Sequence, residues 1–102
     1  MKSTINLVGN IAQRAVYIDG KKLDPAKSLQ VVNHSPDGFA WGYGGSGPAQ
    51  LALAILLEFM SEDFARQNYQ KFKNEFVAKL PQRDFDMQIP DIYELIERTT
   101  RL

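Results

Sequence analysis

The stretch His34–Met60, HSPDGFAWGYGGSGPAQLALAILLEFM, decides the fold of this chain. Within Pro48–Met60 only Gln50 and Glu58 are strongly polar, so apolar side chains point in every direction of a helix at about 100° per residue. Such a helix is buried, in a core or in a membrane, and this one is shorter than the roughly 20 apolar residues that span a bilayer. Gln50, Ala54 and Glu58 lie four residues apart, and this stripe is expected to be the only side that contacts water. The sequence therefore predicts a central core helix over residues 48–60.

The glycine cluster before this helix is the first candidate site. Pro48 suits a first helical turn because it has no N–H group to leave unpaired, and Ser46 or Gly47 can serve as the N-cap. Glycine-rich backbone allows another group to approach closely, and a helix N-terminus presents free N–H groups and the positive end of its dipole to an anion. We therefore expect a site for a phosphorylated or otherwise anionic ligand. The residues expected to form it are His34, Trp41, Tyr43, Gly44, Gly45, Ser46, Gly47 and Gln50.

A purely structural role of the same stretch is an alternative. The glycines can serve only to let the aromatic segment pack closely over the helix and turn into it. Phe39, Trp41 and Tyr43 can belong to the core instead of forming a stacking surface. The string also lacks the lysine of G-x-x-x-x-G-K-[ST] and the spacing of G-x-G-x-x-G, which disfavours a standard nucleotide-binding fold.

Catalysis by Ser46 with His34 as its base is a second alternative, and would make the protein a minimal hydrolase or transferase. The segment GGSGP does not match the G-x-S-x-G nucleophile elbow, because a proline stands at the last position. A triad also needs an orienting acid, and Asp19 and Asp37 both lie in turn sequences. One histidine and no cysteine fall short of the usual metal-ligand sets. We expect a non-catalytic protein with no metal and no cofactor.

The composition narrows the class of protein. A chain of 102 residues corresponds to a single domain over residues 1–102 with one modest core. Lysine plus arginine equals aspartate plus glutamate at 12 each, so the charge gives no case for nucleic-acid binding. There is no cysteine, hence no disulfide framework, and MKSTINLVGN lacks the apolar stretch of a signal peptide. We expect a cytoplasmic protein without membrane or nucleic-acid partners.

The segments on either side of the central stretch predict a small antiparallel sheet of three to five short strands. Alternation over residues 4–8 predicts an edge strand, and residues 15–18 predict another that ends at the tight turn Asp19-Gly20. A hairpin is expected over residues 29–43, built around a turn of proline and glycine chemistry. Residues 85–89 alternate again and predict a further strand.

Two further helices complete the predicted α+β fold. Apolar residues recur at steps of three and four over residues 62–79, after Ser61 as a cap, and again over residues 91–100. The sheet and these helices are all that the chain offers to cover a helix that is apolar on every side. A symmetric homodimer that completes this cover is therefore an alternative to a self-sufficient core.

Most of the chain, roughly from Val16 to Pro81, resembles a family of small uncharacterised proteins from bacteria, phages and mobile elements. The string GFxWGYGGSGPAQLALA at Gly38–Ala54 carries the resemblance, together with the aspartate-glycine turn at Asp19 and with Tyr69 in the helix that follows. The resemblance implies no established activity. It implies that the glycine loop is the hallmark of the family, and a genomic setting in which proteins acting for or against host defence are common.

These observations favour a binding protein over the alternatives. We expect the glycine loop and its neighbouring aromatics to hold an anionic small molecule or a host defence protein. The alternatives are the minimal hydrolase or transferase and a purely structural homo-oligomeric module.

Overall fold

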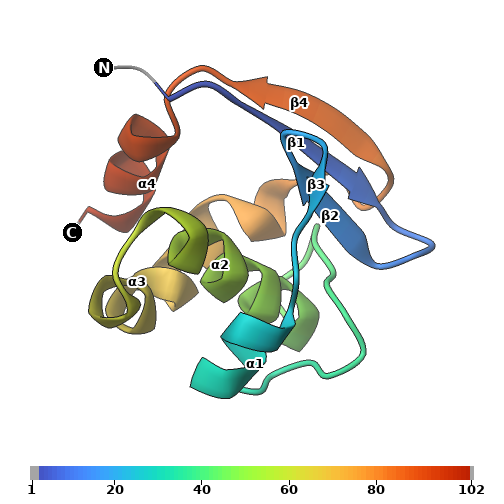
Figure 1. The fold of residues 1–102 in the computed structure, drawn as a ribbon, viewed down its shortest axis with the longest axis horizontal. Coiled ribbons are helices and arrows are strands. Elements are labelled where there is room, and N and C mark those ends of the chain that lie inside the picture. The colour runs from blue at the N-terminus through green and yellow to red at the C-terminus, as the bar shows by residue number, and fades with distance from the viewer. Residues whose placement is uncertain (1–2, 102) are drawn as a thin grey trace.

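The computed structural model describes residues 3–101, and within them four short strands form one antiparallel sheet. The strands are β1 (Ile5–Asn10), β2 (Ala15–Ile18), β3 (Lys21–Lys22) and β4 (Phe85–Ile89). Their order is β3-β2-β1-β4, so the last strand of the chain pairs with the first and lies at one edge (Figure 1). The strands predicted at 15–18 and 85–89 are confirmed. The predicted N-terminal strand also forms, but it is an inner strand because β2 and β4 pair with its two sides.

The turn at Asp19-Gly20 is confirmed as a tight hairpin turn. Both residues have positive φ, +52° at Asp19 and +80° at Gly20, between the paired residues Ile18 and Lys21. Two central residues with positive φ are characteristic of a type I′ turn, which matches the twist of the strands that it joins. Asp19 is also bonded to β1, since its Oδ1 accepts from the N–H of Asn6 at 2.8 Å.

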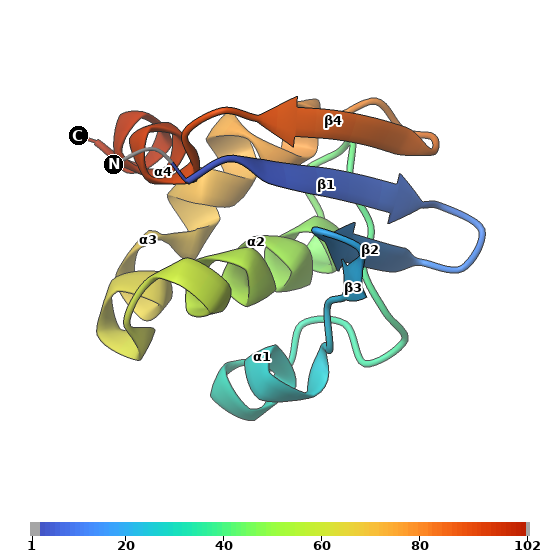
Figure 2. The same ribbon diagram turned by 45° about the horizontal axis from the view of Figure 1, so that its top comes forward.

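The helices are α1 (Ala26–Val31), α2 (Ser46–Phe59), α3 (Glu62–Glu75), the 3₁₀ helix η1 (Val77–Lys79) and α4 (Ile92–Thr100). The predicted central helix and the two predicted later helices are confirmed. The helix predicted over 62–79 is divided, because Phe76 leaves helical geometry at φ −129°, ψ −62° and η1 follows it. The fold is therefore α+β, with an antiparallel sheet and helices in a second layer (Figure 2).

Helix α2 forms the centre of the core. Every residue from Gly47 to Leu57 is buried, and Figure 2 shows the sheet on one side of α2 with α1 and α3 on others. The expected water-facing stripe is wrong in two of its three positions, since Gln50 is 0% and Ala54 3% exposed and only Glu58 faces solvent. Because the chain itself covers this helix, α2 needs no second copy to complete its cover.

The hairpin predicted over residues 29–43 is wrong in its first half. Residues 29–31 belong to α1, because local hydrogen bonds there stabilise a helical turn. The side chain of Asp24 accepts from the N–H of Ala26 at 2.9 Å, and the hydroxyl of Ser28 donates to the carbonyl of Pro25 at 2.8 Å. These bonds outweigh the β-propensity of the valines at the end of the segment, which is a weak preference that depends on context.

The second half of the predicted hairpin is an extended segment without a partner strand. Its alternation is real, since Phe39 is 2% and Trp41 0% exposed. Its backbone, however, makes single bonds to separate elements: Phe39 N–H donates to Arg14 C=O at 3.1 Å, and Gly42 N–H donates to Val77 C=O at 3.1 Å. The period of two therefore predicted the directions of Phe39 and Trp41, but not that of Tyr43, which is 44% exposed after Gly42 at φ +85°, and it did not predict the pairing.

The burial of Trp41 leads to a spectroscopic prediction. Trp41 is the only tryptophan in the chain, and its enclosed ring should give a blue-shifted emission that acrylamide quenches only weakly. Fluorescence of the folded protein, compared with the urea-unfolded protein and with N-acetyltryptophanamide, measures this. Emission and quenching like those of the free model compound would contradict the position of residues 39–43 in the core.

Candidate functional site

Gln50 is at the centre of a buried hydrogen-bond network. Its Oε1 accepts from the backbone N–H groups of His34 at 2.7 Å and Ser35 at 3.0 Å. Its Nε2 donates to Ser28 Oγ at 2.9 Å and to Val32 C=O at 3.0 Å. The amide thus uses both donor hydrogens and both acceptor positions. Gln50 thus attaches residues 28–35 to α2, and its side-chain amide has no free donor or acceptor position for a ligand.

His34 is bonded to Tyr69 and not to Ser46. The ring nitrogen Nε2 of His34 lies 2.7 Å from Tyr69 Oη, with the two ring centroids 5.5 Å apart. Among residues 3–101 the hydroxyl of Ser46 forms no hydrogen bond. A nucleophile and its general base need to lie within hydrogen-bond reach of one another. The structure therefore does not assemble the Ser46–His34 pair that a hydrolase would use.

Trp41 is enclosed by the segment that leads into β4. Its Nε1 donates to the carbonyl of Arg83 at 2.9 Å, and its ring packs edge-on against Phe85 with centroids 5.1 Å apart. A fully buried indole with a satisfied N–H is the usual state of a core tryptophan. Trp41 therefore offers no ring face to a ligand in this structure.

The part of the candidate site that reaches the surface is the segment from Tyr43 to Gly47, called the Tyr43–Gly47 segment below; Gly47, its last residue, is buried. Tyr43 is 44% exposed, Gly44 and Ser46 are exposed, and Gly45 is half-buried. The Tyr43 ring lies over Gly45, where a Cβ atom would come within 2.5 Å of it. Toward residues 3–101 the N–H groups of Gly44, Gly45, Ser46 and Gly47 donate no hydrogen bond. Free amides are thus gathered beside an aromatic ring at the start of α2.

The N-terminus of α2 differs from those of α3 and α4. Its N-cap is Gly45, so the N-cap predicted at Ser46 or Gly47 is wrong. No side chain caps this helix, and its first turn contains no acid. In contrast, Ser61 Oγ accepts from the N–H of Phe64 at the start of α3, and Asp91 Oδ1 accepts from that of Glu94 at the start of α4. The first amides of a helix carry a partial positive charge that caps and acids normally offset. At α2 this charge is not offset.

Arg14 adds a full positive charge beside the same helix end. Its Nη2 atom lies 3.4 Å from the position that a Cβ atom on Gly47 would take. The guanidinium donates from Nε to Phe39 C=O at 3.2 Å and from Nη2 to Ser35 Oγ at 3.3 Å and Gly38 C=O at 3.4 Å. No ion pair with a carboxylate is found for it in the described part of the chain. Sequence reasoning missed Arg14 because its partners are distant along the chain and no local motif marks it.

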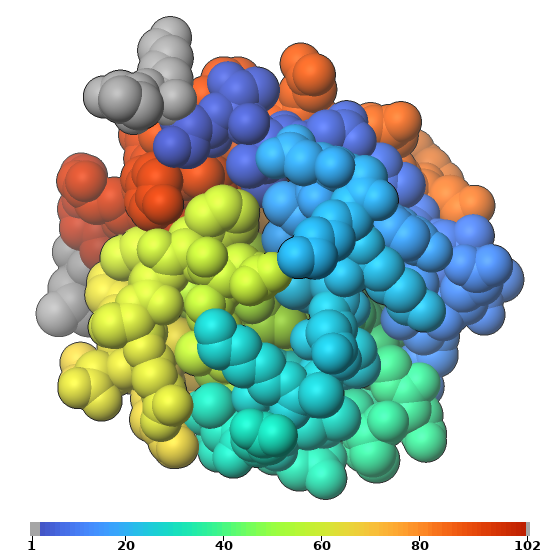
Figure 3. All heavy atoms as spheres, viewed as in Figure 1, coloured from blue at the N-terminus to red at the C-terminus, as the bar shows by residue number. Residues whose placement is uncertain are grey.

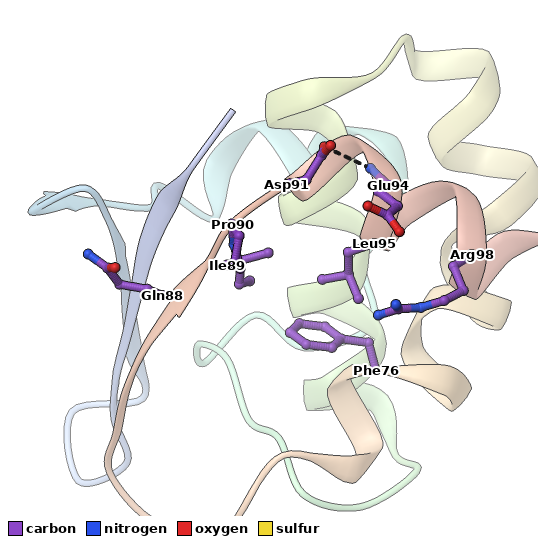
Figure 4. Close-up of a pocket in the computed structure, with 8 residues that line it drawn as sticks. All are labelled: Phe76, Gln88, Ile89, Pro90, Asp91, Glu94, Leu95 and Arg98. Carbon is purple, nitrogen blue, oxygen red and sulfur yellow. Dashed lines mark hydrogen bonds between the residues drawn. The ribbon is translucent and has the colours of Figure 1, made fainter. Parts of the chain in front are cut away.

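The cavity shown in Figure 4 lies away from this segment. It has a volume of about 360 Å³ and opens between the end of β4 and α4. It is lined by Phe76, Gln88, Ile89, Pro90, Asp91, Glu94, Leu95 and Arg98. None of the eight residues predicted for the site is among them. Within residues 3–101 there is no cluster of three or more metal-ligating side chains, and no helix there is long and apolar enough to cross a membrane.

Replacing Gln50 by leucine is predicted to destabilise the protein. Leucine fills similar space but leaves the buried N–H group of Ser35, and the partly buried N–H of His34 and carbonyl of Val32, without this partner. A buried unpaired group costs about 1–3 kcal/mol, so the free energy of unfolding should fall by about 2 kcal/mol or more. Urea unfolding measures it, with Gln70→Leu on the exposed side of α3 as the matched control, expected within about 0.5 kcal/mol of the parent. A Gln50→Leu variant as stable as this control would contradict the role of the network.

Gly42 and Gly44 are predicted to respond oppositely to alanine. Gly42 has φ +85°, and a Cβ there would lie 2.9 Å from both Gln82 Cα and Leu80 C=O, so Gly42→Ala should cost about 2–3 kcal/mol. Gly44 has no positive φ and nothing within 4 Å of its added Cβ, so Gly44→Ala should change stability by less than about 0.5 kcal/mol. Thermal and urea unfolding of the two variants compare them. Equal losses would mean that Gly44 also has a packing role.

The comparisons with known proteins support the resemblance to a family of unknown function. No curated protein and no solved structure matches the chain. The sequence profile of a family of unknown function, DUF6166, matches residues 8–98, which include every helix in full except α4 and all of the Gly38–Ala54 string. Because this match covers most of the chain, the protein belongs to the DUF6166 family, a family of unknown function.

Proposed function

We propose that the protein is a cytoplasmic, non-catalytic binding protein that holds an anionic group at the Tyr43–Gly47 segment. The observation that carries this proposal is the set of amides of Gly44, Gly45, Ser46 and Gly47, which donate to no acceptor in residues 3–101. Phosphate and carboxylate oxygens are the natural acceptors for several convergent backbone N–H groups at the start of a helix.

The local charge supports an anion. The first turn of a helix carries the equivalent of about half a positive charge, and α2 has no acid in that turn. The guanidinium of Arg14 lies beside the same turn, with its Nη2 3.4 Å from the Cβ position of Gly47. Because both charges have the same sign and no carboxylate of residues 3–101 pairs with either of them, an anion at this end of α2 gains from each of them.

The shape of the segment limits the kind of ligand. The half-exposed ring of Tyr43 offers one apolar face next to the amides, which suits a ligand whose anionic group adjoins a planar or apolar part. The segment lies outside the cavity of Figure 4, so the ligand would be held on the surface. A phosphorylated small molecule or an acidic group on a host protein meets these conditions, and the resemblance to phage and mobile-element proteins favours the second.

The geometry does not favour the enzyme alternative. His34 is engaged with Tyr69 at 2.7 Å, and its backbone N–H is held by Gln50. General-base catalysis of a Ser46 attack would require His34 and Ser46 to lie within hydrogen-bond reach of one another, and within residues 3–101 no hydrogen bond joins them. Holding an anion requires no such pair.

Titration with inorganic phosphate is predicted to shift the amide resonances of the Tyr43–Gly47 segment. Two-dimensional ¹H–¹⁵N NMR should show the largest changes at Gly44, Gly45, Ser46 and Gly47, with an apparent Kd on the order of 1–10 mM for the free anion. Shifts spread over all surface amides, or none at this segment, would overturn the proposal.

Two substitutions of Ser46 distinguish the contribution of its backbone N–H to phosphate binding from that of its hydroxyl. Ser46→Pro removes the N–H but suits the first position of a helix, and Gly45 before it is already extended at φ −118°, ψ −165°. Ser46→Ala keeps the N–H and removes only the hydroxyl. Phosphate affinity should fall about 3–10-fold in Ser46→Pro relative to Ser46→Ala. Equal affinities in the two variants would show that the amide takes no part.

A further inference from the structure

β4 is an edge strand, and the pairing of β1 shows which of its backbone groups are free. Asn6 C=O accepts from the N–H of Asp19 at 2.8 Å, and Asn6 N–H donates to Asp19 Oδ1 at 2.8 Å, so the backbone groups of Asn6 point toward β2. Backbone groups alternate in direction along a strand. Those of Leu7 therefore point toward β4, where Leu7 lies opposite Met87.

The same alternation directs the N–H and C=O groups of Asp86 and Gln88 away from β1, into the open edge. Both residues are exposed, and no hydrogen bond from their backbone groups to residues 3–101 is found outside the ladder with β1. Figure 1 draws β4 outside β1, and in the space-filling view its atoms reach the upper right rim of the molecule (Figure 3). An edge strand with unpaired groups is a template for another strand.

We propose that β4 pairs with β4 of a second copy of this chain, in antiparallel orientation about a two-fold axis at Met87. The two four-stranded sheets would then form one continuous sheet. In this register Asp86 lies opposite Gln88 of the partner subunit, and the reverse pair follows from the symmetry. Each of these two pairs exchanges two backbone hydrogen bonds.

The side chains of β4, FDMQI, are complementary to themselves in this register. The carboxylate of Asp86 faces the amide of the partner's Gln88, which can donate to it. Phe85 lies opposite the partner's Ile89, and Met87 lies opposite its own symmetry mate, so apolar residues meet apolar residues. The order of apolar and polar residues in β4 is therefore the same when read from either end, with Met87 at the centre.

The two neighbouring registers of the β4–β4 pair are each disfavoured, one by like charges and the other by a missing backbone donor. A shift toward the N-terminal end of β4 sets Asp86 opposite the partner's Asp86, and like charges directly opposite one another are destabilising. A shift toward the other end sets Asp86 opposite the partner's Pro90, which has no N–H to donate. The register centred on Met87 pairs all four outward groups of Asp86 and Gln88 and sets no aspartate opposite another.

The proposed dimer should be weak because the interface is small. Two strands of five residues form a short ladder, well below the standard interface size of roughly 1,600 Å². A dissociation constant on the order of 10–100 µM is therefore expected. Sedimentation equilibrium from about 5 µM to 1 mM protein covers this range.

A charge swap on the edge tests the register. Gln88→Asp sets an aspartate opposite the partner's Asp86 twice in the dimer and should weaken dimerisation about tenfold. The double variant Asp86→Gln, Gln88→Asp restores an aspartate–glutamine pair and should dimerise within about twofold of the parent. Gln67→Asp adds the same charge on exposed α3 and should leave the constant unchanged. A double variant that stays as weak as Gln88→Asp would overturn the register.

Gln88→Pro tests the backbone pairing without reversing a charge. The N–H of Gln88 faces the open edge, so proline there leaves the β1–β4 ladder intact and removes two donors from the dimer. This variant should remain folded, with the Trp41 emission of the parent, and should be monomeric at concentrations where the parent is dimeric. A parent protein that stays monomeric up to 1 mM would overturn the proposal. A dimer insensitive to both Gln88→Pro and Gln88→Asp would do so too.

Discussion

The burial of α2 on every side is the constraint on which the rest of the structure depends. A helix buried from Gly47 to Leu57 must be covered by several elements at once. The polar side chain in that run, Gln50, attaches the connection between α1 and α2 to the helix. The amide of Gln50 satisfies backbone groups between Val32 and Ser35, of which the N–H of Ser35 is buried and would cost about 1–3 kcal/mol without a partner. The irregular connection from α1 to α2 is thus held in place by α2 itself.

The sequence predicted those parts of the fold whose cause is local or periodic. The apolar run of α2, the spacing in α4 and the Asp19-Gly20 turn all act within a few residues, and each was predicted correctly. The hairpin over 29–43 failed because its outcome depends on distant partners. Alternation predicted that Phe39 and Trp41 face the core, but only the positions of Arg14 and Val77 decide that this backbone bonds to a turn and to η1 instead of to another strand.

The residues expected to form the site divide into two groups in the structure. Free amides lie in the glycine cluster, but Trp41, Gln50 and His34 make their polar contacts within the fold. A sequence shows that a residue can bond to a ligand and does not show whether a backbone group has already taken that bond. Arg14 was missed for the converse reason, since its charge reaches α2 only through tertiary structure.

The two candidate surfaces are linked through core contacts of Trp41 and Gly42. Tyr43 follows Trp41 by two residues, and Trp41 packs edge-on against Phe85, the first residue of β4, while its indole N–H is bonded to Arg83. Gly42 N–H is also bonded to η1, which precedes the same strand. The packing that turns the Tyr43–Gly47 segment toward solvent therefore also sets the start of the β4 edge. Because buried contacts of this kind tolerate little displacement, the position of the free amides and the register of the edge strand depend on one shared piece of core.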